Sequence, residues 1–130
     1  MKELSVRTSQ REEMIDITHL VRDFAKEAGI TDGICHVFVP HTTCGILINE
    51  NADPDVTRDI LDALRVLAPA TANYRHVEGN SPAHIKSSLV GCSKTLMLAN
   101  GRLCLGTWQG IFLCEFDGPR HRKVWLQVVG

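Results

Sequence analysis

The dipeptide Asn100-Gly101 limits the possible folds of this chain more than any other stretch does. It lies between the apolar runs "TLML" and "RLCL", and Asn-Gly is the sequence that a type I′ turn between antiparallel strands prefers. Asp117-Gly118-Pro119 is also typical of a turn, and it separates the strand-like "GIFLCEF" from "RHRKVWLQVV". These two signals predict two β-hairpins and therefore antiparallel strand pairing.

Three helices are predicted before these hairpins. Thr18 is expected to cap a helix that Gly29 ends, and Asp53-Pro54 begins a second helix that stops near Pro69. Ser81-Pro82 opens a third helix, which Gly91 closes. The apolar stripes of the first two are Leu20, Phe24 and Ala28, and Val56, Ile60, Leu64 and Leu67.

Four further segments have the composition of strands: residues 3–8, 13–18, 33–41 and 43–50. In residues 33–41 the side chains alternate, with Ile34, His36 and Phe38 on one face and Cys35, Val37 and Val39 on the other. Helices grouped between strands that hairpins join predict an α+β fold with a mainly antiparallel sheet. The length of 130 residues fits a single domain, residues 1–130.

Composition limits the class of partner. The net charge is −1, so no basic surface for nucleic acid is predicted. Four Phe, two Trp and one Tyr are also too few for a base-stacking platform. No apolar run reaches the roughly 18 residues that a membrane helix needs, and the first residues lack the apolar stretch of a signal peptide. We expect a cytoplasmic protein that binds neither nucleic acid nor membrane.

Cysteine usage agrees with a reducing compartment. The five cysteines are an odd number and form no C-x-x-C pair. Four of them, Cys35, Cys44, Cys104 and Cys114, lie in strand-like surroundings and are expected to be reduced core residues. Cys44 beside His41 is the nearest candidate for a nucleophile, but packing as a small apolar residue is the expected role.

The stretch "YRHVEGNSPAHIK", residues 74–86, is the richest in chemistry. A helix start offers unpaired backbone N–H groups and partial positive charge, so residues 82–85 could bind phosphate. His84 lies in that first turn, and Gly79 gives the backbone freedom to fold His76 toward it. A solvated loop with two surface histidines explains the same residues, since histidines eight positions apart match no standard zinc spacing.

Other polar groups stand at predicted strand ends, where ligands are commonly presented. His41, Thr42 and Thr43 form a hydroxyl-rich turn, and Asn49 and Glu50 end a strand. Asp59 lies on an acidic helix face, Trp108-Gln109 joins two strands, and Arg120 follows a proline that could hold its guanidinium for contact with phosphate. Each has a simpler alternative in local turn bonding, a solvated face or core packing.

Taken together, the blocks "HTTCGILINEN", "DPDVTRD", "AHIK" and "GRLCLGTWQGIFLCEFDGPR" resemble the YjbQ family of small bacterial and archaeal proteins. The resemblance runs from about residue 36 onward. It implies a compact α+β subunit, a homotrimer, and shared polar residues near the subunit interface. It also implies the activity often attached to the family, secondary thiamine-phosphate synthase, which joins a pyrimidine carried on diphosphate to a thiazole phosphate and releases pyrophosphate.

The resemblance also suggests roles for the residues. It implies catalytic roles for His41, Glu50, His76, His84 and Gln109, substrate contacts from Thr42, Thr43, Asn49, Asn80, Lys86, Trp108 and Arg120, and a further matching position at Asp59. A divalent metal ion, Mg²⁺ or Zn²⁺, would be held by His76, His84 and Glu50.

Two functions remain open from the sequence. The first is an enzyme that acts on phosphorylated small molecules and neutralises a departing diphosphate with the helix start, Lys86 and Arg120. The second is a trimer that binds a metal or a phosphorylated metabolite without turnover. No activated nucleophile is recognisable, so a covalent intermediate is not expected.

Overall fold

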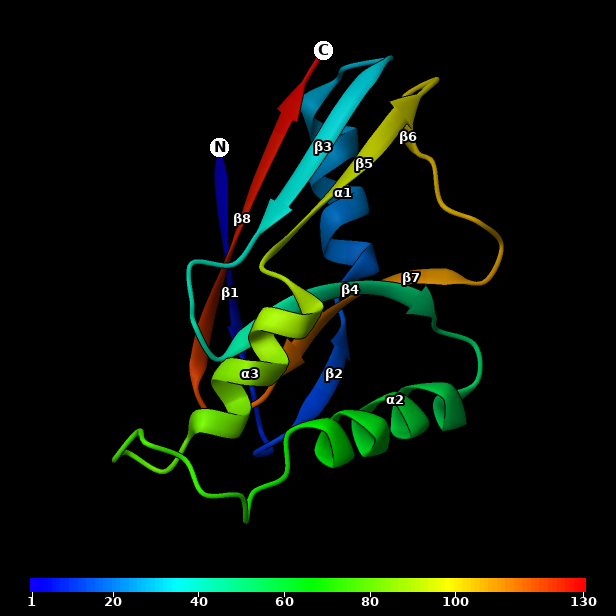
Figure 1. Ribbon diagram of the computed structural model, residues 1–130. Coiled ribbons are helices and arrows are strands. Elements are labelled where there is room, and N and C mark those ends of the chain that lie inside the picture. Colours follow the sequence, from blue (N-terminus) through cyan, green and yellow to red (C-terminus); the bar gives the residue numbers. More distant parts are fainter.

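The computed structural model describes residues 1–130 and consists of two antiparallel sheets and three helices (Figure 1). The five-stranded sheet has the order β1 (Lys2–Arg7), β8 (His121–Val129), β3 (Gly33–Phe38), β5 (Ser93–Ala99) and β6 (Arg102–Leu103). The three-stranded sheet has the order β2 (Glu13–Asp16), β7 (Gln109–Glu115) and β4 (Cys44–Glu50). The helices are α1 (Thr18–Ala28), α2 (Pro54–Leu67) and α3 (Ser81–Val90). The predicted single α+β domain is confirmed.

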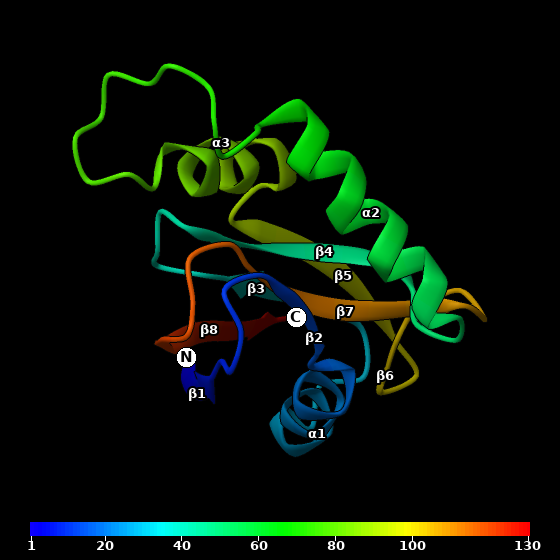
Figure 2. The same cartoon turned by 90° about the horizontal axis from the view of Figure 1, so that it is seen from below.

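The three-stranded sheet is covered on both faces. One face and α1 pack against the five-stranded sheet in the main core, where Val21, Ile46 and Leu126 are fully buried. The other face packs against α2 and α3 (Figure 2). Leu64 of α2 and Phe112 of β7 belong to the buried cluster between them. Burial on both faces explains why β7 is a continuous apolar run instead of an alternating one.

The turn at Asn100-Gly101 is confirmed. Both residues have positive φ, 53° and 74°, as a type I′ turn requires, and they connect β5 to β6.

The second predicted hairpin is wrong, because β7 pairs with β2 and β4 whereas β8 pairs with β1 and β3. The segment between β7 and β8 instead leads from the three-stranded sheet to the five-stranded sheet. It runs beside residues 8–11, which lead from the five-stranded sheet back to the three-stranded one. Backbone bonds from Thr8 N to Arg120 O and from Gly118 N to Arg11 O hold the two crossings together.

The helix boundaries agree with the sequence, although two details differ. Asp53 caps α2 by accepting from Asp55 N, and Gly29 ends α1 with a positive φ of 67°. Thr18 is not the cap of α1; its backbone N–H donates to Asp16 and its hydroxyl accepts from Ile111 N. The ends of both predicted apolar stripes, Ala28 and Leu67, are exposed because the buried faces are centred on Val21 and Leu64.

All five cysteines are free thiols. Cys35, Cys44 and Cys114 are buried as predicted, but Cys104 is exposed because it follows the two-residue strand β6 and leaves the sheet. None of the three helices combines the length and apolarity that crossing a bilayer requires.

Candidate functional site

Three chain segments that lie far apart in the sequence enclose an open, polar pocket of about 330 Å³. The β3–β4 loop, the segment that leads into α3, and the start of β8 form its walls. We name it the Arg122 pocket, and it is lined by Pro40, His41, Thr42, Thr43, Glu78, Asn80, His84, Arg120 and Arg122. Six of the residues predicted from the sequence therefore meet: His41, Thr42, Thr43, Asn80, His84 and Arg120.

Arg122 is the buried anchor of this pocket. Its side chain is 4% exposed, and its Nε donates to Oε2 of the fully buried Glu115 at 2.7 Å. Its Nη2 donates to both oxygens of Thr43, the carbonyl at 3.2 Å and the hydroxyl at 2.7 Å. The third nitrogen, Nη1, has no hydrogen-bond partner within the chain. The guanidinium is thus fixed in place with one donor group left for a ligand.

His41 is held as a neutral ring with a defined tautomer. Its Nε2 accepts a hydrogen bond from the backbone N–H of Lys123 at 2.9 Å, so the ring proton resides on Nδ1. Burial, followed by the charges of Arg122 and Arg120, lowers the pKa of His41 below its usual value. A neutral imidazole of this tautomer donates from Nδ1 and accepts nothing further through Nε2.

Because its pKa is lowered in the folded state, His41 should make the stability of the protein depend on pH. In the unfolded chain His41 takes up a proton near pH 6.5, whereas in the folded chain it does so only at lower pH. The unfolded state therefore binds more protons in that window, and stability falls as the pH drops below about 6.5. Urea unfolding at pH 7.5 and 5.5 should show a smaller fall for His41→Gln than for the wild type; equal falls would contradict the assignment.

Arg120 and Asn80 share one carboxylate. Asp117 accepts from Arg120 Nη2 and from Asn80 Nδ2, both at 2.9 Å. Although burial acts to raise it, these hydrogen bonds lower the pKa of Asp117, so the carboxylate stays ionised. Asn80 Oδ1 is buried and has no partner, which makes it an acceptor in need of a donor.

The start of α3 differs from the predicted anion site. Pro82 has no N–H, and the N–H groups of Ala83 and His84 both bond to Asn80 O. These donors are therefore satisfied within the chain and are not free for phosphate. The predicted approach of His76 to His84 does occur, with ring centroids 5.3 Å apart in an edge-to-face arrangement. His76 lines the neighbouring pocket, which also contains His84.

Two other predicted contacts serve the fold. Lys86 is buried and donates to Glu12 Oε2 at 2.6 Å, which ties α3 to the β1–β2 crossing, so it does not line the Arg122 pocket. Thr43 is buried and accepts from Arg122 through both of its oxygens, whereas Thr42 is exposed at the pocket and its hydroxyl makes no hydrogen bond within the chain.

A second group lies at the opposite end of the three-stranded sheet. Asn49 and Glu50 end β4 and pair with Gly110 and Gln109 of β7. Trp108 precedes Gln109, and 62% of its surface is exposed. We call Asn49, Glu50, Trp108 and Gln109 the Trp108 edge. β4 begins at Cys44, beside α3, so roughly 20 Å of strand separates this edge from the Arg122 pocket (Figure 1).

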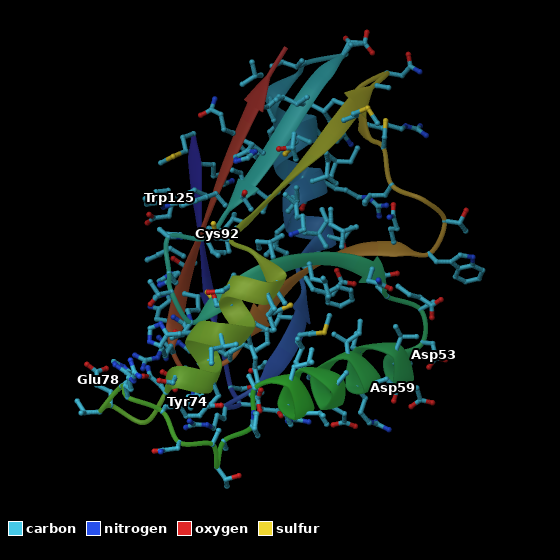
Figure 3. All side chains as sticks on the ribbon, in the orientation of Figure 1. Asp53, Asp59, Tyr74, Glu78, Cys92 and Trp125 are labelled. Carbon is cyan, nitrogen blue, oxygen red and sulfur yellow. The ribbon has the colours of Figure 1, made fainter.

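Asp59 joins neither group. It is exposed on α2 beside Asp53, at the far side of the molecule from Tyr74 and Glu78 (Figure 3).

A metal ion does not fit the predicted set within one chain. Glu50 lies at the Trp108 edge, whereas His76 and His84 lie beside the Arg122 pocket. No group of three or more His, Cys, Asp or Glu side chains gathers anywhere in the chain in a way that could hold one. Zinc and magnesium sites need several such ligands, so His76, His84 and Glu50 do not form a metal site within one chain.

Comparison with known proteins identifies the family. The model of the UPF0047 protein YjbQ-like family matches residues 2–130. The chain belongs to the YjbQ family. A UPF0047 protein of Methanocaldococcus jannaschii is 53% identical over 96% of this chain and 91% of its own length. YugU of Bacillus subtilis is 52% identical over 100% of this chain and 99% of its own.

Solved structures show the same fold. A YjbQ/UPF0047 protein of Clostridium acetobutylicum, an orthologue of YugU, has a TM-score of 0.98 and 56% identity over 99% of this chain and 100% of its own. A YjbQ-like protein of unknown function from Sulfolobus solfataricus has a TM-score of 0.96 at 32% identity, over 99% and 95% of the two chains. The likeness to the YjbQ family thus covers the first 35 residues as well.

The central residues of the Arg122 pocket, Arg122 and its partner Glu115, are not among those predicted from the sequence. Val124, Leu126 and Val128 alternate along β8 toward the core, and the same alternation carried back two positions reaches Arg122. Glu115 stands inside the apolar run of β7. Charges at inward positions of two strands are the signal of a buried ion pair, and that signal was readable in the sequence.

Proposed function

We propose that the Arg122 pocket binds the phosphate groups of a small molecule, and that the protein joins a pyrimidine diphosphate to a thiazole phosphate as a thiamine-phosphate synthase does. The observation that carries the proposal is the buried guanidinium of Arg122 with Nη1 unused. Unlike Asn80 Oδ1, this nitrogen is not sealed from solvent, so a ligand in the pocket can reach it. A phosphate oxygen at the pocket would complete its hydrogen bonding.

Neighbouring groups suit the same anion. His41 can donate from Nδ1, and Arg120 is fixed by two bonds to Asp117 with the rest of its guanidinium unbonded. These three donors come from a fixed scaffold, so they need little rearrangement when charge develops.

The proposed reaction needs stabilisation of a leaving group. The bond between the pyrimidine methylene carbon and the diphosphate oxygen breaks, and pyrophosphate departs with the electron pair. The thiazole nitrogen supplies the pair for the new C–N bond, so no oxidant or other co-reactant is required. Arg122, Arg120 and the His41 N–H would stabilise the departing negative charge, and His84 or His76 would supply a proton to it.

We propose a homotrimer in which the Trp108 edge of one subunit completes the Arg122 pocket of the next. Two observations support this arrangement. The pocket contains no aromatic side chain other than histidine rings, although the substrate rings need a stacking surface. Trp108 is 62% exposed beside Gln109, which is exposed as well.

Binding without turnover is the second candidate, and the Arg122 pocket supports it too, because the same donors would hold a phosphate whether or not it reacts. Cys44 lies next to the pocket, but burial raises the pKa of its thiol to about 11, so the thiolate is scarce at neutral pH. No other activated nucleophile faces the pocket, so catalysis through a covalent intermediate is disfavoured. Direct attack by the thiazole nitrogen and binding without turnover by a trimer both need no such group. The free cysteines support a cytoplasmic location for either.

The test is to mix the purified protein with both thiamine precursors and magnesium and to measure thiamine phosphate. We expect wild-type product formation and a decrease of at least about 100-fold for His84→Ala, the range of a lost proton donor. His36→Ala is the matched control, because His36 bonds to Thr95 on the five-stranded sheet and should leave the rate unchanged. Equal traces of product from wild type and His84→Ala would refute the transferase; saturable binding of both precursors without product would establish the second candidate.

A further inference from the structure

A second pocket, of about 500 Å³, lies between α1 and the β5–β6 hairpin. It shares no lining residue with the Arg122 pocket. Buried Ala25 and half-buried Leu103 line its apolar part. Arg22, Lys26 and Arg102 form its charged rim. We name it the α1 groove.

The three cations of the α1 groove have no partner in the chain. Of the 14 Lys and Arg residues, eight form ion pairs. Lys94 binds two carbonyl oxygens, which leaves five cations unpaired. Three of those five line this one groove, and no carboxylate lines it. In a chain of net charge −1, this concentration of unpaired positive charge is local to the groove.

This arrangement carries an electrostatic cost in the absence of a ligand. Arg22 and Lys26 are four residues apart on α1 and therefore occupy the same helix face, where like charges destabilise each other. Arg102 enters from β6, and the Asn100-Gly101 turn closes the groove beside it. The cations are held by two different elements around a concave surface, so a bound anion would relieve the repulsion between them and gain contacts from all three.

We propose that the α1 groove binds a small multivalent anion of the phosphate-ester class, at a site separate from the Arg122 pocket. Two guanidinium groups and one ammonium suit a diphosphate or two phosphates, because Arg makes bidentate contacts with phosphate oxygens. The apolar part of the groove accommodates the uncharged portion of such a molecule. Three cations are too few to follow a nucleic-acid backbone, so a small molecule is the occupant.

The experiment uses inorganic pyrophosphate as the probe and amide chemical shifts of the full-length protein as the readout. In the wild type we expect saturable shifts at Gly101, Arg102 and Leu103. Lys26→Gln combined with Arg102→Gln should weaken binding at these amides about tenfold or more, as expected when two charged contacts are lost. Lys2→Gln combined with Arg58→Gln is the matched control, since it removes the same charge from exposed, ion-paired positions.

The residue-resolved readout keeps this proposal distinct from that of the Arg122 pocket. Shifts at the amides of Thr42 and His84 report binding at the Arg122 pocket, and shifts at the amides of the β5–β6 hairpin report binding at the α1 groove. Either proposal can therefore be refuted while the other stands. Unchanged hairpin amides at millimolar pyrophosphate would overturn the α1 groove as an anion site. An equal loss of affinity in the control pair would do the same, because it would show attraction by net charge and no specific site.

Discussion

Replacing Arg122 by methionine is expected to destabilise the folded protein by about 3–5 kcal/mol, the range for a buried pair that loses one partner. Glu115 is fully buried, and the guanidinium of Arg122 is the cation that meets it. Methionine fills similar space but leaves the carboxylate without its counter-charge. Urea unfolding at pH 7 measures the loss, and phosphate binding at the Arg122 pocket, followed by amide shifts, should disappear in the same variant.

The pH dependence of this variant has a definite sign. Burial raises the pKa of Glu115 even with Arg122 in place, and removal of the cation raises it further. The unfolded carboxyl ionises near its ordinary value of 4.5, so the unfolded state releases its proton first. Stability of Arg122→Met should therefore fall as the pH rises above about 4.5 and recover toward acid pH. A variant whose stability rises with pH in this range would contradict the buried-carboxylate assignment.

A double variant separates the fold from the site. Glu115→Leu combined with Arg122→Met replaces the whole ion pair by apolar groups, which is commonly close to neutral for stability. We expect most of the lost stability to return while phosphate binding stays absent. If the double variant bound phosphate as the wild type does, Arg122 would have only a structural role.

The sequence was a better guide to the elements than to their assembly. The Asn100-Gly101 turn and the start of α2 depend on backbone conformations and caps that a few adjacent residues determine, and both were predicted correctly. The turn at residues 117–119 also depends on local residues, but a local signal does not say which strands will pair. That choice depends on the crossing beside residues 8–11, more than a hundred positions away, so β7 and β8 were assigned to one hairpin instead of two sheets.

The candidate site divides in the same way. Turn and helix-start residues such as His41, Asn80 and His84 were recognised as polar groups at element ends, and they do meet in one pocket. The sequence does not show that the two ends of β4 present their polar residues at opposite edges of the molecule. Thr43 directly precedes the first residue of β4 and Glu50 is its last, so neighbours in the motif lie at opposite ends of a sheet. Lys86 illustrates a different limit, because its burial against Glu12 is set by a partner 74 positions away.

Those opposite ends provide the sharpest test of the proposed trimer. Mixing His84→Ala with Trp108→Ala, each inactive alone, is expected to restore about one third of wild-type thiamine phosphate formation in the purified mixed trimers. In a cyclic trimer each composite site takes the Arg122 pocket from one subunit and the Trp108 edge from its neighbour. A mixed trimer of either 2:1 composition therefore has both halves intact at about one interface in three. Differently tagged chains, refolded together and purified through both tags, supply the mixed trimers.

The matched control for this experiment mixes His84→Ala with His41→Ala. Both changes lie in the Arg122 pocket, so every mixed interface has one damaged pocket and no activity should return. If activity returns in the first mixture and not in this control, the Arg122 pocket and the Trp108 edge must act from different chains. Within one chain roughly 20 Å of β4 separates them. Mixed trimers no more active than either parent would show that the Trp108 edge does not complete a neighbour's pocket, and the exposed tryptophan would then need another partner.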